Sequence, residues 1–461
     1  MTRDQRFVLT IAILASFVAF LDGSVINVAL PAISSELGGG LSTQQWVVDA
    51  YLITLGSLIL LAGSLSDVFG RLVILRIGLI GFGLASVFIA LAPSAEILIL
   101  LRGVQGIAGA LLVPSSLALI MSTFRGTAQA HAIGQWTAWT SAAFIVGPVL
   151  GGAFVDLLSW RLVFAINVIP IAITLWLLVK LGHRDERKAN TRIDFLGAAL
   201  GIVGLGGPVF ALIEQGNLGW NSPAVVIPLV VGILSFIAFI VWQRRAAQPM
   251  LPLELFRHRN FSLGNIATFF IYGALALGGF IMVVYLQEVA GYSATFAGFA
   301  FLPSSLAIIL LSSFFGRLSG TYGPRLFMTL GPFLAGVGYV TFLSMGESVN
   351  YVTQVLPGVL LFSVGMSMTV APLTSAILGA ISAEQAGIGS AVNNAVSRIA
   401  GLVTVALIGV ITVGSLSPAN FHRVVIVTAA LLFAGALTSF LGIRNSAALD
   451  DDPSEVAPPL A

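Results

Sequence analysis

Long apolar runs dominate the chain, and only a few polar positions interrupt each of them. A helix needs about 20 apolar residues to cross a bilayer. The pattern predicts fourteen such helices, joined by loops too short to hold a soluble domain. Their expected ranges are 7–30, 44–65, 72–92, 96–122, 130–154, 161–181, 193–214, 223–243, 261–287, 294–316, 325–345, 351–378, 386–413 and 422–443.

The basic residues predict how these helices are oriented. Cytoplasmic loops of membrane proteins carry an excess of Lys and Arg. With the N-terminus in the cytoplasm, all but four of the 21 basic residues fall on cytoplasmic segments. The four exceptions are Arg161 and Arg423 on the outside and Arg102 and Arg398 within helices. We therefore expect both termini in the cytoplasm, and a disordered tail over 446–461.

Composition supports a membrane protein. The chain is 57% hydrophobic and 9% charged, whereas a soluble domain carries about 25% charged residues. Arginine is far more frequent than lysine, which is typical of a GC-rich bacterial genome. We expect an all-α, multi-pass protein of the bacterial cytoplasmic (inner) membrane, with the lipid bilayer as its solvent.

Two short segments indicate an internal repeat. Gly63–Arg71 reads GSLSDVFGR, and Gly316–Arg325 reads GRLSGTYGPR, 253 residues further on. Each follows the second helix of a six-helix block. We therefore expect a six-helix bundle over 1–192, two inserted helices over 193–244 and a second six-helix bundle over 245–445. Two six-helix halves are typical of transporters with a substrate site between the halves.

Four motifs carry a resemblance to the major facilitator superfamily, and within it to the fourteen-helix drug:proton antiporter family. They are the Gly63–Arg71 loop, Leu21–Pro31 (LDGSVINVALP), Leu101–Gly106 (LRGVQG) and Gly147–Gly152 (GPVLGG). Val68 and Leu72 stand where the loop motif of the family has basic residues. Ala143 stands where the family's motif in the fifth helix, here 130–154, has its leading glycine.

The resemblance implies a major facilitator fold and alternating access. It also implies that two groups of residues gate the transport path. One is cytoplasmic, with an ion pair between Asp67 and Arg125, and the other is the kinked glycine segment of helix 5, which closes the cavity. The expected gating residues are Gly63, Asp67, Gly70, Arg71, Arg125, Gly147, Pro148, Gly151 and Gly152.

Charged residues within the predicted helices are the candidates for chemistry, since each costs at least about 2.5–3.5 kcal/mol in the hydrocarbon. At about 1.5 Å per residue, Asp22, Asp49 and Arg102 reach similar depth in the first bundle, and Gln105 lies one turn deeper than Arg102. We expect Asp22, Asp49 and Arg102 to take part in proton coupling, with Asp22 carrying the proton, and Asp49 also to attract a cationic substrate. A structural ion pair is the alternative.

Other polar and aromatic residues are candidates for lining a cavity between the halves. Aromatic rings and a carboxylate together suit lipophilic cations. Besides Asp49 and Gln105, the expected substrate contacts are Asn27, Trp139, Tyr285, Asn394 and Arg398. For Arg398, a bond to backbone carbonyls is the alternative to a position facing the cavity.

Several functions are excluded or disfavoured. Cysteine is absent, the four histidines are not spaced as metal ligands, and no nucleotide-binding loop of the GxxxxGK[ST] type occurs. We expect no enzyme activity, cofactor, metal or nucleic-acid partner, and a functional monomer. The leading interpretation is a proton-coupled exporter of lipophilic, cationic drugs. The alternatives are a dedicated exporter of a natural product, lipid or metabolite, a proton-coupled importer, and a membrane-embedded enzyme or sensor.

Overall fold

The computed structural model describes residues 1–181, 193–382, 385–412 and 416–445. Within these ranges, fourteen helical segments are long and apolar enough to span a membrane, as the sequence predicts. The expected tail over 446–461 and four of the cytoplasmic basic residues, Arg184, Arg187, Lys188 and Arg192, lie outside the described ranges.

The first bundle consists of α1 Arg3–Leu37, α2 Gly40–Phe69, α3 Arg71–Ala90, α4 Ala95–Thr123, α5 Gly126–Ser141, α6 Ala143–Leu157, α7 Leu162–Ala165 and α8 Val168–Leu181. The inserted pair is α9 Phe195–Leu218 and α10 Pro223–Arg245. The second bundle consists of α11 Arg259–Glu288, α12 Ala294–Phe299, α13 Leu302–Tyr322, α14 Pro324–Thr341, α15 Leu356–Leu378, α16 Ala386–Ala406, α17 Ile408–Ile411 and α18 Pro418–Gly442.

Helices prevail because a spanning backbone finds no water in the hydrocarbon and must satisfy its own polar groups. Several spans are assembled from two helical pieces, such as α5 with α6 and α12 with α13. A short 3₁₀ helix, Leu253–Arg257, joins the inserted pair to the second bundle.

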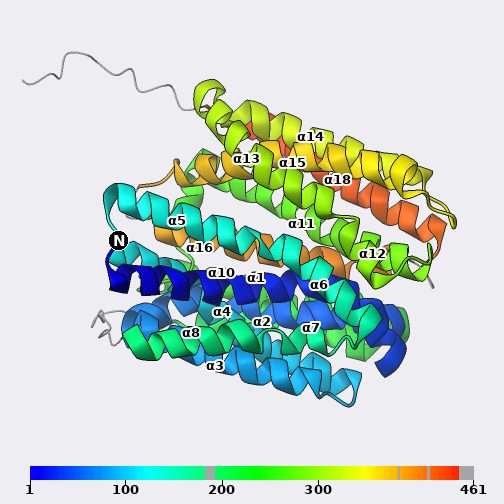
Figure 1. Ribbon diagram of the computed structural model, residues 1–461, viewed down its shortest axis with the longest axis horizontal. Helices are drawn as coiled ribbons and strands as arrows, with labels where there is room; N and C mark the ends of the chain where they lie inside the picture. The colour runs from blue at the N-terminus through cyan, green and yellow to red at the C-terminus, as the bar shows by residue number, and fades with distance from the viewer. Residues whose placement is uncertain (182–192, 383–384, 413–415, 446–461) are drawn as a thin grey trace, which may run out of the picture.

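The two bundles lie side by side with their helices nearly parallel (Figure 1). They meet where α2 contacts α16, α1 contacts α11, and α6 contacts α12. The helix ends that carry Arg71, Arg125 and Arg325 share one end of the molecule with the N-terminus. The positive-inside rule assigns this end to the cytoplasm, and we call it the cytoplasmic end and the other the outer end.

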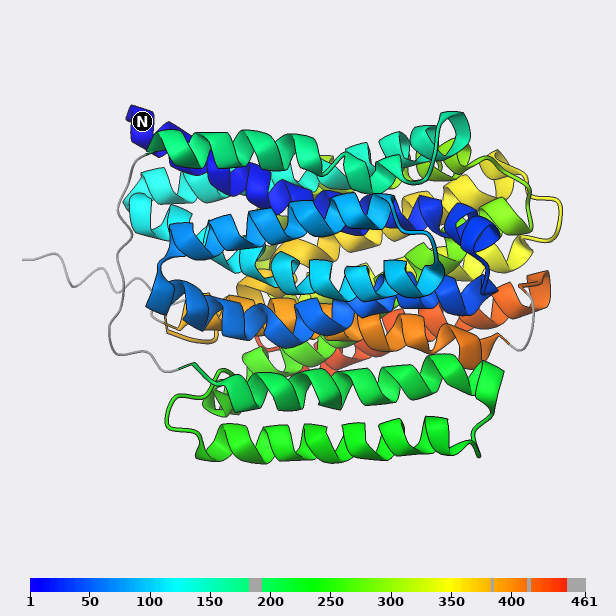
Figure 2. The same ribbon diagram turned by 90° about the horizontal axis from the view of Figure 1, so that it is seen from below.

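The inserted helices α9 and α10 form a hairpin on one flank of the molecule (Figure 2). Small residues let the two helices approach closely: a Cβ on Gly207 would collide with the carbonyl oxygen of Pro228. On its inner side α9 contacts α2, α16 and α17. The hairpin therefore covers the line along which α2 and α16 bring the two bundles together.

The Gly63–Arg71 motif corrects one boundary. The sequence predicts a loop between residues 65 and 72, but α2 continues to Phe69, and α3 begins at Arg71. Only Gly70 separates them, with φ of 103°, a conformation that favours glycine. In the second bundle, Gly323 likewise separates α13 from α14, with φ of 81°. The repeated glycine thus makes the same helix-to-helix turn in both halves.

Candidate functional site

Asp22 and Arg102 form a buried ion pair between α1 and α4. Nη1 of Arg102 lies 2.6 Å from Oδ2 of Asp22, and both side chains are 1% exposed. Nη1 also donates to Gln105 Oε1 at 2.5 Å, and Nε donates to the carbonyl oxygen of Val47 at 2.9 Å. The structure therefore brings together Asp22, Arg102 and Gln105, three of the four polar residues that the sequence singles out in this bundle.

Two further side chains complete this network. Asn167, in the turn between α7 and α8, donates to Oδ1 of Asp22 at 3.0 Å, as does Nε2 of Gln105. Ser86 on α3 accepts from both amides, at 2.9 Å from Gln105 and 3.3 Å from Asn167. Donors thus converge on both oxygens of Asp22, an arrangement that suits an ionised carboxylate.

Aromatic rings enclose the cation of this pair. Cζ of Arg102 lies 4.4 Å from the ring centroid of Tyr51 and 5.7 Å from that of Phe164. Sequence reasoning missed Tyr51, Ser86 and Asn167. Of these three, Asn167 could have been found from the sequence, because it is the only amide in the apolar run 161–181.

Asp49 does not join this network. Its side chain is fully buried, and neither carboxyl oxygen has a hydrogen-bond partner among the described residues. One turn before it, Gln45 donates to the carbonyl oxygens of Val405 and Ala406. One turn after it, Ile53 belongs to an apolar cluster with Ala406. Because positions four residues apart share a helix face, Asp49 lies on the face of α2 that meets the second bundle.

Arg398 lies at the contact between the bundles, near the middle of α16. Its Cζ is 5.8 Å from the ring centroid of Phe20, whose ring in turn lies 5.8 Å from that of Phe144. Nε of Arg398 is buried and has no hydrogen-bond partner in the part of the chain that the structure describes. The sequence left a carbonyl-bonded position open for this residue, but the side chain reaches across to α1 instead.

The remaining predicted substrate contacts differ in position. Asn27 is partly exposed, on the same face of α1 as the exposed Gly23. Asn394 is partly exposed on α16, and Trp139 on α5 is 61% exposed. Tyr285 is a correction: it is fully buried, stacks on Phe421 with centroids 3.9 Å apart, and donates to the carbonyl oxygen of Gly346. This ring supports the second bundle and offers no surface to a substrate.

The glycines of α6 pack against both bundles near the outer end. A Cβ on Gly151 would lie 2.5 Å from Val25 on α1, and one on Gly152 would lie 2.6 Å from the backbone of Ala294 on α12. Gly147 packs in the same way against Ser24, and Pro148 against Gly298. Larger residues would force the two helices away from α6, so this segment depends on small side chains.

Polar contacts join the bundles at the same end. The Asp156 carboxylate accepts from the backbone N–H groups of Ala294 and Thr295, at 3.1 and 2.7 Å. Gln44 donates to Glu288 at 2.6 Å, and Gln287 donates to the carbonyl oxygen of Val28 at 3.2 Å. These contacts close the outer end of the interface between the halves.

At the cytoplasmic end, Asp67 pairs with Arg71 one turn later on the chain, at 3.6 Å. In place of the expected pair with Asp67, the Arg125 guanidinium donates to the carbonyl oxygen of Met121 at 2.7 Å. Gly63 lies inside α2, two turns before its end. As for metals, the described residues hold no group of three or more His, Cys, Asp or Glu side chains that could bind an ion.

Comparison with known proteins agrees with this architecture. The chain is 34% identical over 417 residues to the puromycin resistance protein of Streptomyces alboniger, covering 88% of this chain and 82% of that one. It is 33% identical to the multidrug resistance protein Stp of Mycobacterium tuberculosis, covering 90% and 78%. It is also 33% identical to the methylenomycin A resistance protein of Bacillus subtilis, covering 88% and 87%.

Solved structures share the fold at low sequence identity. A peptide transporter POT in complex with sulfate superposes with a TM-score of 0.71 at 16% identity, covering 96% of this chain and 94% of that one. A D-xylose–proton symporter superposes with a TM-score of 0.66 at 15% identity, covering 95% and 98%. The family model of the Major Facilitator Superfamily matches residues 12–405, and this chain therefore belongs to that superfamily of membrane transporters.

Proposed function

We propose that this protein exports lipophilic drugs from the cytoplasm across the bacterial inner membrane, in exchange for protons. The observation that carries the proposal is Asp49, a buried carboxyl group on the helix face where the halves meet, which has no hydrogen-bond partner in the described part of the chain. A transporter that moves its halves apart and together changes the solvation of this group in every cycle. A single chain supplies both halves, so we propose a functional monomer.

The names of the relatives support drugs as the substrate class. All three reported relatives are named for drug resistance, and each is matched over most of its length. Two of the names refer to a single antibiotic, which favours a second candidate: a dedicated exporter of one natural product. A panel of unrelated toxic compounds separates the two, since a dedicated exporter protects against one chemical class.

Asp49 is the better proton carrier of the two acids. An ionised carboxylate without partners in a dry interface is strongly disfavoured, so this environment suits the protonated form. When the group becomes accessible from the cytoplasmic side, a cationic substrate can approach it, and its proton can leave to the cytoplasm. One charge crossing 100 mV is worth about 2.3 kcal/mol, which is enough to drive uphill export.

For Asp22, the geometry favours the alternative that the sequence left open. Protonating Asp22 would place an O–H group among the donors of Arg102, Gln105 and Asn167 and break the ion pair. We therefore propose that Asp22 and Arg102 hold α1 and α4 together as a rigid unit. The unit keeps α2 in register through the bond from Arg102 to Val47.

Transport then alternates between two arrangements of the halves. In this structure, the glycine segment of α6 and the Asp156 contacts close the outer end. Opening that end requires α6 to leave α12 and α2 to leave α16, which would expose Asp49 to the outside. We propose that external protonation of Asp49 precedes closure, and that substrate displaces the proton from the cytoplasmic side.

Everted membrane vesicles provide the test. The vesicles are energised, their internal pH is followed with a dye, and ethidium is added as a lipophilic cation. Wild type, Asp49→Asn and Asp22→Asn are compared at matched expression. Proton release evoked by ethidium in wild type but not in Asp49→Asn supports the proposal. Release that persists in Asp49→Asn and disappears in a folded Asp22→Asn protein assigns the proton to Asp22 instead.

A further inference from the structure

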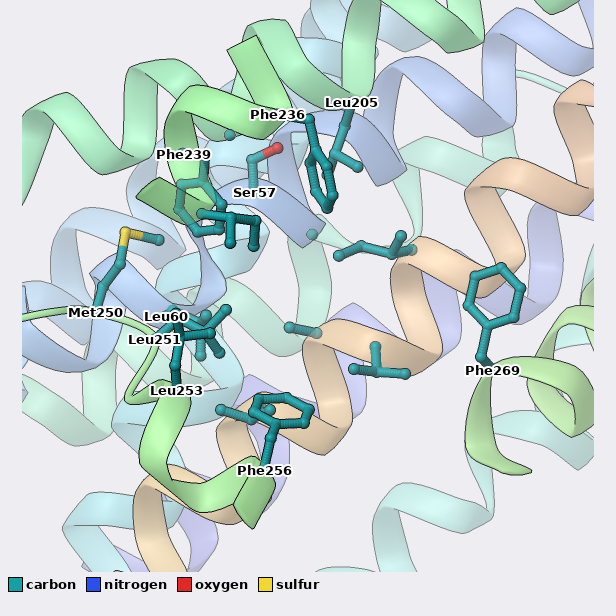
Figure 3. Close-up of a pocket in the computed structure, with 17 residues that line it drawn as sticks. Ser57, Leu60, Leu205, Phe236, Phe239, Met250, Leu251, Leu253, Phe256 and Phe269 are labelled. Atoms are coloured by element: carbon teal, nitrogen blue, oxygen red, sulfur yellow. The ribbon is translucent and has the colours of Figure 1, made fainter. Parts of the chain in front are cut away.

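An apolar cavity lies beside α2 and α16, under the inserted hairpin. Its volume is about 410 Å³, within the range of small-molecule sites. Figure 3 shows its walls: Ser57 and Leu60 come from α2, Leu205 from α9, Phe236 and Phe239 from α10, and Phe269 from α11. The segment that enters the second bundle contributes Met250, Leu251, Leu253 and Phe256.

One polar residue, Ser57, takes part in this apolar lining. Its side chain is 5% exposed, and its Oγ is buried just behind the cavity surface, with no hydrogen-bond partner among the described residues. On the neighbouring helix α16, by contrast, the buried hydroxyl of Thr404 bonds to the carbonyl oxygen of Ala400 one turn back. A lone hydroxyl in an apolar cavity is the type of group that orients a ligand.

The cavity also lies in line with Asp49. On α2, Asp49, Ile53, Ser57 and Leu60 follow one another at helical spacing and share a face. Leu205 lines the cavity and also packs in the apolar cluster of Ile53. A single apolar layer therefore separates the cavity from the unpartnered carboxyl group.

We propose that this cavity is a binding site for the apolar body of a lipophile with one hydrogen-bond acceptor, to which the Ser57 hydroxyl donates after rotating about its Cα–Cβ bond. This inference rests on the proposed export function, in which the site holds the exported compound on its way to Asp49. The inserted hairpin forms the outer wall, and this gives α9 and α10 a role that a six-plus-six transporter lacks.

A phospholipid acyl chain fits the cavity less well. Its ester oxygens lie at the membrane interface, level with the cytoplasmic segment that holds Leu253 and Phe256. Ser57 is 12 residues from the cytoplasmic end of α2, which at about 1.5 Å per residue is about 18 Å deep. An acyl chain would present only methylene groups to the hydroxyl at that depth.

Benzophenone is the probe for the test, because it is apolar, carries one carbonyl acceptor and crosslinks to nearby C–H groups under ultraviolet light. Purified full-length protein in lipid nanodiscs is labelled, and mass spectrometry locates the adducts. The expected adducts lie on cavity residues such as Leu60, Met250 and Val396. Labelling confined to the lipid-facing surface would overturn the proposal.

Variants sharpen the test. Gly201 lines the cavity, and a Cβ there would meet only Ser57, at 3.9 Å, so Gly201→Leu fills the space without a backbone clash. The same substitution at Gly216 on the same helix meets nothing within 4 Å and is the control. We expect cavity adducts to fall at least fivefold in Gly201→Leu and to stay unchanged in Gly216→Leu. Ser57→Ala should weaken benzophenone binding about three- to tenfold; equal labelling in Gly201→Leu and wild type would contradict the site.

A final experiment distinguishes a bound phospholipid from a bound lipophilic compound. Nanodiscs that contain a phospholipid with a diazirine in its acyl chain are irradiated with and without benzophenone. Cavity labelling by the acyl chain that benzophenone does not displace would overturn the assignment. The readout needs neither protons nor transport. Cavity adducts together with normal export by Asp49→Asn would therefore refute only the proposed coupling, and proton-driven export without cavity adducts would refute only the site.

Discussion

Arg102 and Asp22 are joined at 2.6 Å, although 80 residues separate them along the chain and neither side chain meets solvent. A second pair in the same bundle, Arg161 and Glu36, has the same separation of 2.6 Å, but its side chains are 31% and 49% exposed. The N–O distance is therefore the same in the two pairs, whereas their burial differs. The exposed pair serves as a reference for the effect of burial on an ion pair.

Removing one member of the buried pair should destabilise the protein strongly. Asp22→Asn leaves the Arg102 charge uncompensated, which we expect to cost about 3–5 kcal/mol. Glu36→Gln at the exposed pair should cost less than about 1 kcal/mol. Thermal unfolding of the purified protein in detergent measures both losses of stability, with the protein that stays folded quantified by size-exclusion chromatography. The double variant Asp22→Asn/Arg102→Met should recover part of the loss, whereas additive losses would show that the pair is not coupled.

Asp49→Asn should show the opposite behaviour, with a fold that is kept and coupling that is lost. The carboxyl group has no hydrogen-bond partner to lose among the described residues, and the amide is of similar size and uncharged. We expect a change in stability of no more than about 1 kcal/mol and a fall of at least about tenfold in substrate-evoked proton release. The same unfolding assay and a pH-sensitive dye in vesicles check the two parts. A large loss of stability would reveal a structural role.

The outer closure should open when α6 gains a single methyl group. Gly152→Ala places a Cβ 2.6 Å from the backbone of Thr295 on α12, where nothing flexible can move aside. The chain has no cysteine, so Ser35→Cys and Ser348→Cys at the outer end give a unique pair for spin labels. We expect longer distances between the labels in Gly152→Ala and a loss of export at normal expression.

The control for this experiment is Gly134→Ala on α5, where a Cβ meets nothing within 4 Å. It should leave both the distances and export unchanged. If Gly152→Ala gave wild-type distances and still lost export, the glycine segment would act on the substrate path and not on the outer closure.

The sequence predicted the fold well because the bilayer imposes a simple constraint. A long apolar segment in a bilayer is stable as a helix, and the basic loops set the orientation of that helix. All fourteen helices therefore lie where the sequence predicts them. The boundary at Phe69 was wrong because a polar helix end extends beyond the hydrocarbon. Hydropathy stops at the apolar run, while the helix itself continues to the glycine at position 70.

The site was predicted in part, because sequence sets depth more readily than direction. The rise per residue placed Asp22, Asp49 and Arg102 at one level. Which way each side chain points depends on packing between helices, and this joined Asp22 to Arg102 but turned Asp49 towards α16. For the same reason Tyr285, a plausible cavity residue by depth, lies inside the second bundle. Predicting these directions would have required knowing which residues on different helices contact each other.

Arg398 should set which substrates the central contact between the bundles accepts. Its guanidinium lies against Phe20, and its buried Nε has no partner among the described residues, so it favours a substrate that presents a hydrogen-bond acceptor there. A bond to a charged donor is worth about 1.5–3 kcal/mol, so Arg398→Gln should reduce export of neutral or anionic acceptors at least about tenfold. Export of ethidium, which carries a fixed positive charge, should be kept or rise because a repelling charge is gone. Vesicle flux of the compounds, compared with Arg398→Lys, measures the split, and equal losses for all of them would assign Arg398 to structure alone.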